Sequence, residues 1–112
     1  MKLYFCIMEE LTAKIIEFNN ARDWDQFHSP ENLAKSIAIE SGELLECFQW
    51  NSDPDINEVK MELADIFNYC LLLADKIGVK PEDIVREKLY ISEQKYPVSK
   101  AKGNSRKYTK LG

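Results

Sequence analysis

The placement of proline and glycine is the feature that most restricts the fold of this 112-residue chain. There are four of each, and apart from Gly42 they fall between segments in which apolar residues recur at helical spacing. Both residue types disfavour helix interiors, so this distribution predicts helices joined by short connections. No stretch shows the alternation of a half-buried strand. The sequence therefore predicts an all-α, four-helix bundle-like fold.

Four helices are expected, and their ends carry recognisable signals. Ser29 is expected to cap the second helix, with Pro30 at its first helical position. Asp55 and Glu58 predict a capping box at the start of the third helix, and Gly78 is expected to end it. The predicted helices span about 9–20, 30–50, 55–77 and 81–96, and residues 98–112 are expected to be irregular.

The net charge of −4 conceals two oppositely charged parts. Residues 1–93 contain all 19 acidic and nine basic residues, a net charge of −10, whereas residues 94–112 contain six basic residues and no acidic one. Nucleic-acid polymers bind proteins largely through neutralisation of their phosphates, which an acidic body does poorly. We therefore expect no nucleic-acid polymer as a partner.

The three cysteines bear on the cellular compartment. Cys6, Cys47 and Cys70 are odd in number and lack paired spacing, so they predict neither a disulfide framework nor a zinc site. The apolar run at residues 3–8 is too short for the core of a signal peptide and is followed by two glutamates. We expect a cytoplasmic protein without a membrane segment.

Four carboxylates fall beside apolar stripes on the second and third predicted helices. The predicted core stripes consist of Leu33, Ile37, Leu44 and Phe48 on the second helix, and of Val59, Leu63, Ile66, Cys70, Leu73 and Ile77 on the third. Glu40 projects into the first stripe, and Glu43 lies beside it. Glu62 and Asp65 lie on the flank of the second stripe, on the side of Tyr69. This flank is therefore not an ordinary solvated face.

The two helices are expected to form an antiparallel hairpin, because the break at residues 51–54 is short. Positions equally far from the break lie at equal height, so Glu40 should face Asp65 and Glu43 should face Glu62. Four carboxylates in one groove repel one another unless a cation neutralises them. All-oxygen ligands suit Mg²⁺, with Mn²⁺ as a substitute. A di-iron bundle would need Glu-x-x-His pairs, and the single histidine, His28, lies elsewhere.

Each of these acids taken alone would ordinarily be a residue at the edge of the core. Their mirrored arrangement is what favours a metal site. Two neighbouring acids are given no such role: Glu46 is expected to point to solvent, and Glu58 is assigned to helix capping.

The spacing of the four acids also resembles a family signature. Glu40-Ser-Gly-Glu43 followed by Glu62-Leu-Ala-Asp65 resembles the ExxE…ExxD motif of the MazG-like nucleoside triphosphate pyrophosphohydrolases, which are all-α and use Mg²⁺. Other segments resemble the dCTP pyrophosphatase branch of that family: residues 22–28 and 42–50, Lys88, Tyr96-Pro97 and residues 105–109. The resemblance covers about residues 10–111. It implies hydrolysis of dCTP or related dNTPs to the monophosphate and pyrophosphate, in nucleotide-pool cleaning.

Carried over by position, the resemblance implies metal binding by Glu40, Glu43, Glu62 and Asp65. One of the two glutamates of the first pair would orient or deprotonate the attacking water, and Lys88 would approach the metal and the phosphates. The implied substrate-binding residues are Trp24, His28, Trp50, Tyr69, Lys88, Arg106, Lys107 and Tyr108. Trp24 and Trp50 would stack on the base and Tyr69 would pack against the sugar.

The resemblance also implies a catalytic domain at residues 1–97, followed by a basic tail, 98–112, that is either part of the substrate site or disordered. It further implies a homo-oligomer, a tetramer built as a dimer of dimers. Two alternatives stay open from the residues. The same chemistry could act on dUTP or a phosphoribosyl-nucleotide, or the chain could be a non-catalytic dimerisation or regulatory module whose acids pair with a partner's basic tail.

Overall fold

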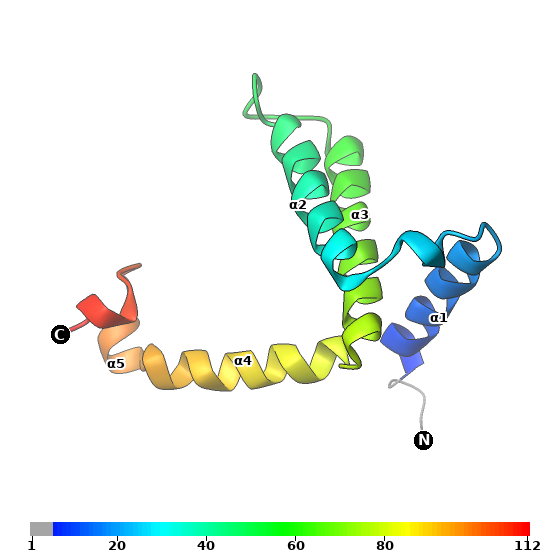
Figure 1. Cartoon of the computed structure of the whole chain (residues 1–112). Helices are drawn as coiled ribbons and strands as arrows, with labels where there is room; N and C mark the ends of the chain where they lie inside the picture. Colours follow the sequence, from blue (N-terminus) through cyan, green and yellow to red (C-terminus); the bar gives the residue numbers. More distant parts are fainter. Residues whose placement is uncertain (1–5) are drawn as a thin grey trace. The chain divides into compact units, whose positions relative to one another are not determined.

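A computed structural model describes residues 6–112, and its described part is built of helices without a strand (Figure 1). Residues 3–5 of the apolar run at 3–8 lie outside these residues. The elements are α1 (Cys6–Asn20), η1 (Asp25–Phe27), α2 (Pro30–Glu46), α3 (Ile56–Ile77), α4 (Pro81–Lys95), α5 (Val98–Ala101) and η2 (Tyr108–Lys110). The predicted all-α class is confirmed. No described helix combines the length and apolarity that a membrane crossing requires.

The chain divides into two compact units, the first ending at Val79 and the second beginning at Lys80. In the first unit, α2 and α3 form the antiparallel hairpin and make the most extensive contact between elements, and α1 packs against α3 (Figure 1). The second unit contains α4, α5 and η2. The predicted division into a domain at 1–97 and a tail at 98–112 stays a prediction.

Local signals fix the start of α2 and both ends of α3. Ser29 Oγ accepts a hydrogen bond from the Asn32 N–H at 3.1 Å, and Pro30 opens α2. Asp55 Oδ1 accepts from the Asn57 N–H at 2.9 Å and caps α3. At the other end of α3, Gly78 has φ 77°, the left-handed conformation that glycine adopts at least cost. Each of these caps satisfies backbone groups that a helix end leaves free.

Two predicted helix boundaries and the predicted conformation of residues 98–112 are wrong. α1 begins at Cys6 and not at Glu9, and α2 ends at Glu46 and not near Trp50. After Glu46 the backbone forms tight turns, in which successive N–H groups from Cys47 to Gln49 donate to carbonyls three residues back. Residues 98–112 are not wholly irregular, since they contain α5 and η2.

The core of the first unit is small and rotated relative to the prediction. Leu33 of α2 is fully buried, and the buried apolar residues of α3 are Leu71, Leu72 and Ala74. Leu63, Cys70 and Ile77, which the sequence placed in the core stripe, are exposed. The packing of α1 on α3 explains the difference, because it buries a face of α3 that a two-helix hairpin alone would leave open.

The second unit is held together by its aromatic residues. The Tyr108 N–H donates to Tyr96 Oη at 3.1 Å, and the two rings meet edge to face with centroids 6.0 Å apart. Lys95 Nζ lies 4.6 Å from the centroid of the Tyr108 ring. These contacts fasten η2 to the end of α4, so the basic tail has a defined conformation within its unit.

Candidate metal centre and substrate face

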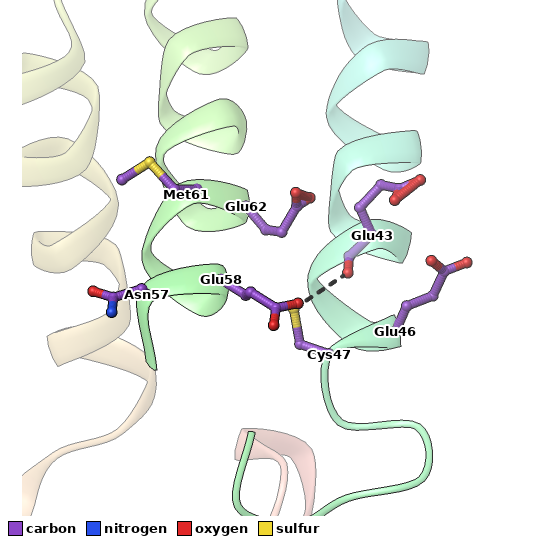
Figure 2. A pocket seen from close by; sticks show the side chains of 7 residues that line it. All are labelled: Glu43, Glu46, Cys47, Asn57, Glu58, Met61 and Glu62. Carbon is purple, nitrogen blue, oxygen red and sulfur yellow. Dashed lines mark hydrogen bonds between the residues drawn. The ribbon is translucent and has the colours of Figure 1, made fainter. Parts of the chain in front are cut away.

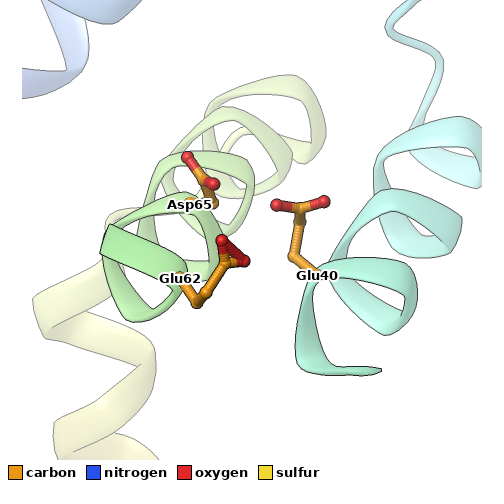
Figure 3. Close-up of side chains that lie close together, drawn as sticks. All are labelled: Glu40, Glu62 and Asp65. Atoms are coloured by element: carbon orange, nitrogen blue, oxygen red, sulfur yellow. The ribbon is translucent and has the colours of Figure 1, made fainter. Parts of the chain in front are cut away.

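Three carboxylates meet where α2 and α3 pack together. Glu40 extends from α2, and Glu62 and Asp65 extend from α3 (Figure 3). Each offers one oxygen, and these oxygens all lie within 4.8 Å of one another. Glu40 and Glu62 are half-buried, whereas Asp65 is exposed. The hairpin thus brings together one acid from the first predicted pair and both acids from the second.

The closeness of these acids changes their protonation. The pKa of Glu40 is raised above its ordinary value of 4.5, first because packing removes water from the carboxylate, and next because its protonated form is hydrogen-bonded to Asp65. The pKa of Glu62 is also raised, by loss of water and then by the negative charges of Asp65 and Glu43. Without a cation, the site therefore favours taking up protons.

Glu40, Glu62 and Asp65 are called the acid trio below. Glu43 lies beside the trio and lines a pocket near the end of the hairpin. This pocket has a volume of about 540 Å³ and is lined by Glu43, Glu46, Cys47, Asn57, Glu58, Met61 and Glu62 (Figure 2). The Cys47 Sγ–H donates to the Glu43 carbonyl at 3.7 Å. Loss of water and the charges of Glu58 and Glu62 raise the pKa of the Cys47 thiol. The pocket is thus a strongly negative extension of the trio.

The roles assigned to Glu46 and Glu58 from the sequence missed this pocket. Both residues line it, and both of their charges raise the pKa of Glu62. The cap of α3 is formed by Asp55 with Asn57, one residue before Glu58, which leaves the Glu58 side chain beside the pocket (Figure 2). The missed signal was spacing, because Glu58 precedes Glu62 by four residues and therefore shares its helix face.

The donor set matches a hard divalent cation. The trio supplies only carboxylate oxygens, and these are the ligands that Mg²⁺ and Mn²⁺ prefer. A cation there would remove the repulsion that raises the pKa values of Glu40 and Glu62. The described residues therefore fit a resident Mg²⁺. Glu43 lies close enough for its negative charge to act on this site.

Beyond Asp65, α3 faces a short connecting segment that carries aromatic residues. The rings of His28 and Tyr69 meet edge to face, with centroids 6.4 Å apart. The rings of Trp24 and of Phe18 in α1 have centroids 5.8 Å apart, and Trp24 remains 44% exposed. Three of the residues assigned to the substrate, Trp24, His28 and Tyr69, thus lie in the same unit as the acids.

A family model described as MazG-like matches residues 35–111, a range that contains all four predicted metal ligands. The chain belongs to the MazG-like family. The dCTP pyrophosphatase 1 proteins of Homo sapiens and Bos taurus are 35% and 34% identical to it, in alignments that span 93% of this chain and 67% and 68% of those proteins. A crystal structure of a pyrophosphatase from Archaeoglobus fulgidus shares 41% identity, with a TM-score of 0.75, over 80% of this chain and 92% of that one.

The remaining residues that the MazG-like resemblance assigned to substrate are exposed. Trp50 follows α2 in the first unit and is 89% exposed. Lys88, Arg106, Lys107 and Tyr108 all belong to the second unit and are exposed. Their approach to the phosphates stays a prediction.

A second pocket adjoins the acids on the α1 side of this MazG-like fold. It has a volume of about 570 Å³ and is lined by Met8, Leu11, Ile15, Ala64, Asp65, Phe67, Asn68 and Leu71. Its lining is mainly apolar, and Asp65 belongs both to this pocket and to the acid trio. Space for an apolar or aromatic group therefore lies directly beside the candidate metal ligands.

Proposed function

We propose that this MazG-like enzyme hydrolyses dCTP or a related dNTP to the monophosphate and pyrophosphate, in an Mg²⁺-dependent reaction that cleans the nucleotide pool. The enzyme class, a nucleoside triphosphate pyrophosphohydrolase, is that of the family and agrees with relatives named as pyrophosphatases. The observation that carries the proposal is the convergence of Glu40, Glu62 and Asp65 on one point between two helices.

Glu40, Glu43, Glu62 and Asp65 would hold the cation. When bound, Mg²⁺ supplies positive charge against the triphosphate and lowers the pKa of coordinated water. The carboxylates alone would repel the substrate, so they act by fixing the position of that charge. Glu40 and Glu43 are the candidates for orienting or deprotonating the attacking water.

The substrate would be bound by residues of both units. Trp24, His28 and Tyr69 provide aromatic surface beyond Asp65, on which a base or sugar can pack. Trp50 is proposed to add a further stacking surface. Lys88, Arg106, Lys107 and Tyr108 are proposed to meet the phosphates, with Lys88 nearest to the reacting group. The basic tail would then supply the charge that the acidic body lacks.

The assembly is proposed to be a homotetramer, a dimer of dimers. Large apolar side chains exposed on the first unit support it, because their burial between subunits would be favourable. Leu45, Trp50 and Phe67 are 71%, 89% and 60% exposed. Sedimentation equilibrium should give four times the mass of 13.0 kDa. A monomer at micromolar concentration would exclude this assembly.

The location is proposed to be the cytoplasm. The described cysteines Cys47 and Cys70 are free thiols, as a reducing compartment would keep them. The acidic body also supports a small nucleotide, and not a nucleic-acid polymer, as the anionic partner.

The test is a hydrolysis assay with purified protein. The substrates are the canonical NTPs and dNTPs, together with dUTP and methylated dCTP. Each is incubated with Mg²⁺, with Mn²⁺ and without a divalent cation, and the monophosphate and pyrophosphate products are separated. We expect pyrophosphate release from dCTP or a related dNTP only when the cation is present. Glu43→Gln should abolish most of this turnover, while Glu31→Gln, an exposed acid at the start of α2, should not. If no triphosphate yields pyrophosphate with either metal, the proposal is wrong, and a regulatory module becomes the better interpretation.

A further inference from the structure

One face of α3 carries polar residues at most of its turns. Glu58, Glu62, Asp65, Tyr69 and Lys76 recur at helical spacing and therefore lie along one face. We refer to this set as the α3 stripe. Its first three members belong to the acid trio or its pocket. The role of the last member, Lys76, is not accounted for by metal binding.

The segment from Trp24 to His28 meets this stripe at two points. His28 meets Tyr69 edge to face, and Asp25 Oδ1 accepts a hydrogen bond from Lys76 Nζ at 2.7 Å. The two charged residues are 51 positions apart in sequence, so their pairing joins separate elements. The hydrogen bond and charge of Lys76 lower the pKa of Asp25, which favours the ionised form of this carboxylate.

The other ties of the segment lead away from α3. The Trp24 N–H donates to the carbonyl of Asn19 in α1 at 3.0 Å. Asn32 Nδ2, in the first turn of α2, donates to the carbonyl of Phe27 at 2.9 Å. These bonds fix the ends of the segment to the neighbouring helices. Between these fixed ends, the described contacts of the segment with α3 are the His28–Tyr69 contact and the ion pair.

We propose that the Lys76–Asp25 ion pair positions the Trp24–His28 segment along the α3 stripe, so that its aromatic side chains are held where the nucleotide binds. Neither charged residue touches the substrate. Both residues are exposed, with side-chain exposures of 29% for Lys76 and 60% for Asp25, so the expected energetic effect of the pair is modest. The inference rests on the proposed function for the identity of the ligand, but not for the position of the segment.

This role separates substrate binding from turnover. Loss of the pair would let the segment move away from α3, which weakens nucleotide binding before the reaction begins. The acids stand on the packed α2–α3 contact and would keep their arrangement. A positioning residue of this kind raises KM and leaves kcat nearly unchanged.

The kinetic test compares Lys76→Met, Asp25→Asn and the double variant, with dCTP and Mg²⁺. We expect each single variant to raise KM about two- to five-fold, with kcat within about two-fold, because exposed ion pairs have effects of this size. The double variant should have the same KM as the more affected single variant. Lys76→Arg, which retains the charge, should restore a KM near that of the wild type.

A matched control removes an ion pair that joins no separate elements. Lys35 Nζ lies 3.0 Å from Glu31 Oε2, and both residues belong to α2. Lys35→Met should leave KM, kcat and the position of the segment unchanged. A melting-temperature measurement on every variant identifies effects that come from stability alone.

A second readout does not depend on catalysis. In a Trp50→Phe background Trp24 is the only tryptophan, so acrylamide quenching reports its accessibility. Lys76→Met and Asp25→Asn should increase the quenching constant, and Lys35→Met should not. If the wild type lacks activity, the proposed function fails, and quenching still decides the positioning role. Unchanged KM in an active enzyme, or unchanged quenching in both variants, would overturn the inference.

Discussion

At one end of the α3 stripe, Glu62 and Asp65 meet Glu40 across the contact between two long helices, whereas at the other end Tyr69 and Lys76 meet a short segment held by polar ties. The arrangement of the acids follows from the register of a packed hairpin, so it does not depend on any one surface bond. The arrangement of the aromatic residues depends on a few such bonds. The proposed metal ligands thus stand on packed helices, whereas Trp24 and His28, which are proposed to bind the nucleotide, stand on a connecting segment.

The strongest test of this contrast is Asp65→Asn at the acid end. The variant keeps the shape of the side chain but removes a charged ligand, and we expect turnover to fall by at least about 100-fold, since even outer-shell partners of metal ligands cost 10- to 100-fold. The melting temperature should not fall, because a repulsive charge is lost. Steady-state hydrolysis and thermal unfolding measure the two effects.

The matched control is Asp75→Asn, the same substitution at an exposed position of the same helix. It should leave turnover unchanged. Equal losses in the two variants would show that the charge of α3 matters in general and that the acid end has no special role.

The second prediction concerns stability, pH and metal. The folded-state pKa values of Glu40 and Glu62 are raised, so the stability that they contribute is present at low pH and is lost as the pH rises through those values. Without a divalent cation, the melting temperature should therefore rise between pH 8 and pH 5 by more in the wild type than in Glu40→Gln. Glu31→Gln should behave as the wild type.

Mg²⁺ should act most strongly where the acids are ionised. At about 100 times its Kd it would add roughly 2.7 kcal/mol to the free energy of unfolding, a shift of about 10 °C in melting temperature at pH 8. The shift should be smaller at pH 5, because protons compete for the same oxygens, and absent in Asp65→Asn. A shift that is equal at both pH values would place the metal elsewhere.

The third prediction, with the smallest expected effects, distinguishes the helix cap of Asp55 from the negative charge of Glu58 at the start of α3. Asp55→Ala removes the cap and should lower the melting temperature by about 4–8 °C, as expected for a loss near 1 kcal/mol. Glu58→Gln should leave the melting temperature nearly unchanged but weaken Mg²⁺ binding about two- to five-fold, through loss of a nearby negative charge. Calorimetric titration measures the second effect. The reverse pattern would support the capping role that the sequence assigned to Glu58.

The sequence was sufficient where the determining interactions are local. Ser29 and Gly78 mark helix ends because capping involves residues only a few positions apart. The mirrored acids were also predictable, since an antiparallel hairpin with a short turn fixes which positions lie at equal height. Glu40 and Asp65 do interact directly, as that argument required.

Interactions between distant residues escaped prediction. The buried face of α3 turns toward Leu71 and Leu72 because α1 packs there, and no helical period shows which side a third helix will cover. The pairing of Asp25 with Lys76 has no sequence signal, because the two residues are 51 positions apart and belong to different elements, η1 and α3. The role of Glu58 was misassigned because an acid at this position is expected both in a capping box and in the lining of the pocket.

Gly42 has a consequence for how readily the protein can tolerate change. It lies within α2 between Glu40 and Glu43, and an added Cβ would meet no atom within 4 Å. A glycine inside a helix costs about 1 kcal/mol relative to alanine. Gly42→Ala would therefore stabilise α2, which carries two of the four predicted metal ligands, without displacing a neighbouring atom. Such a background offers spare stability, in which damaging substitutions elsewhere in the chain can be studied in a folded protein.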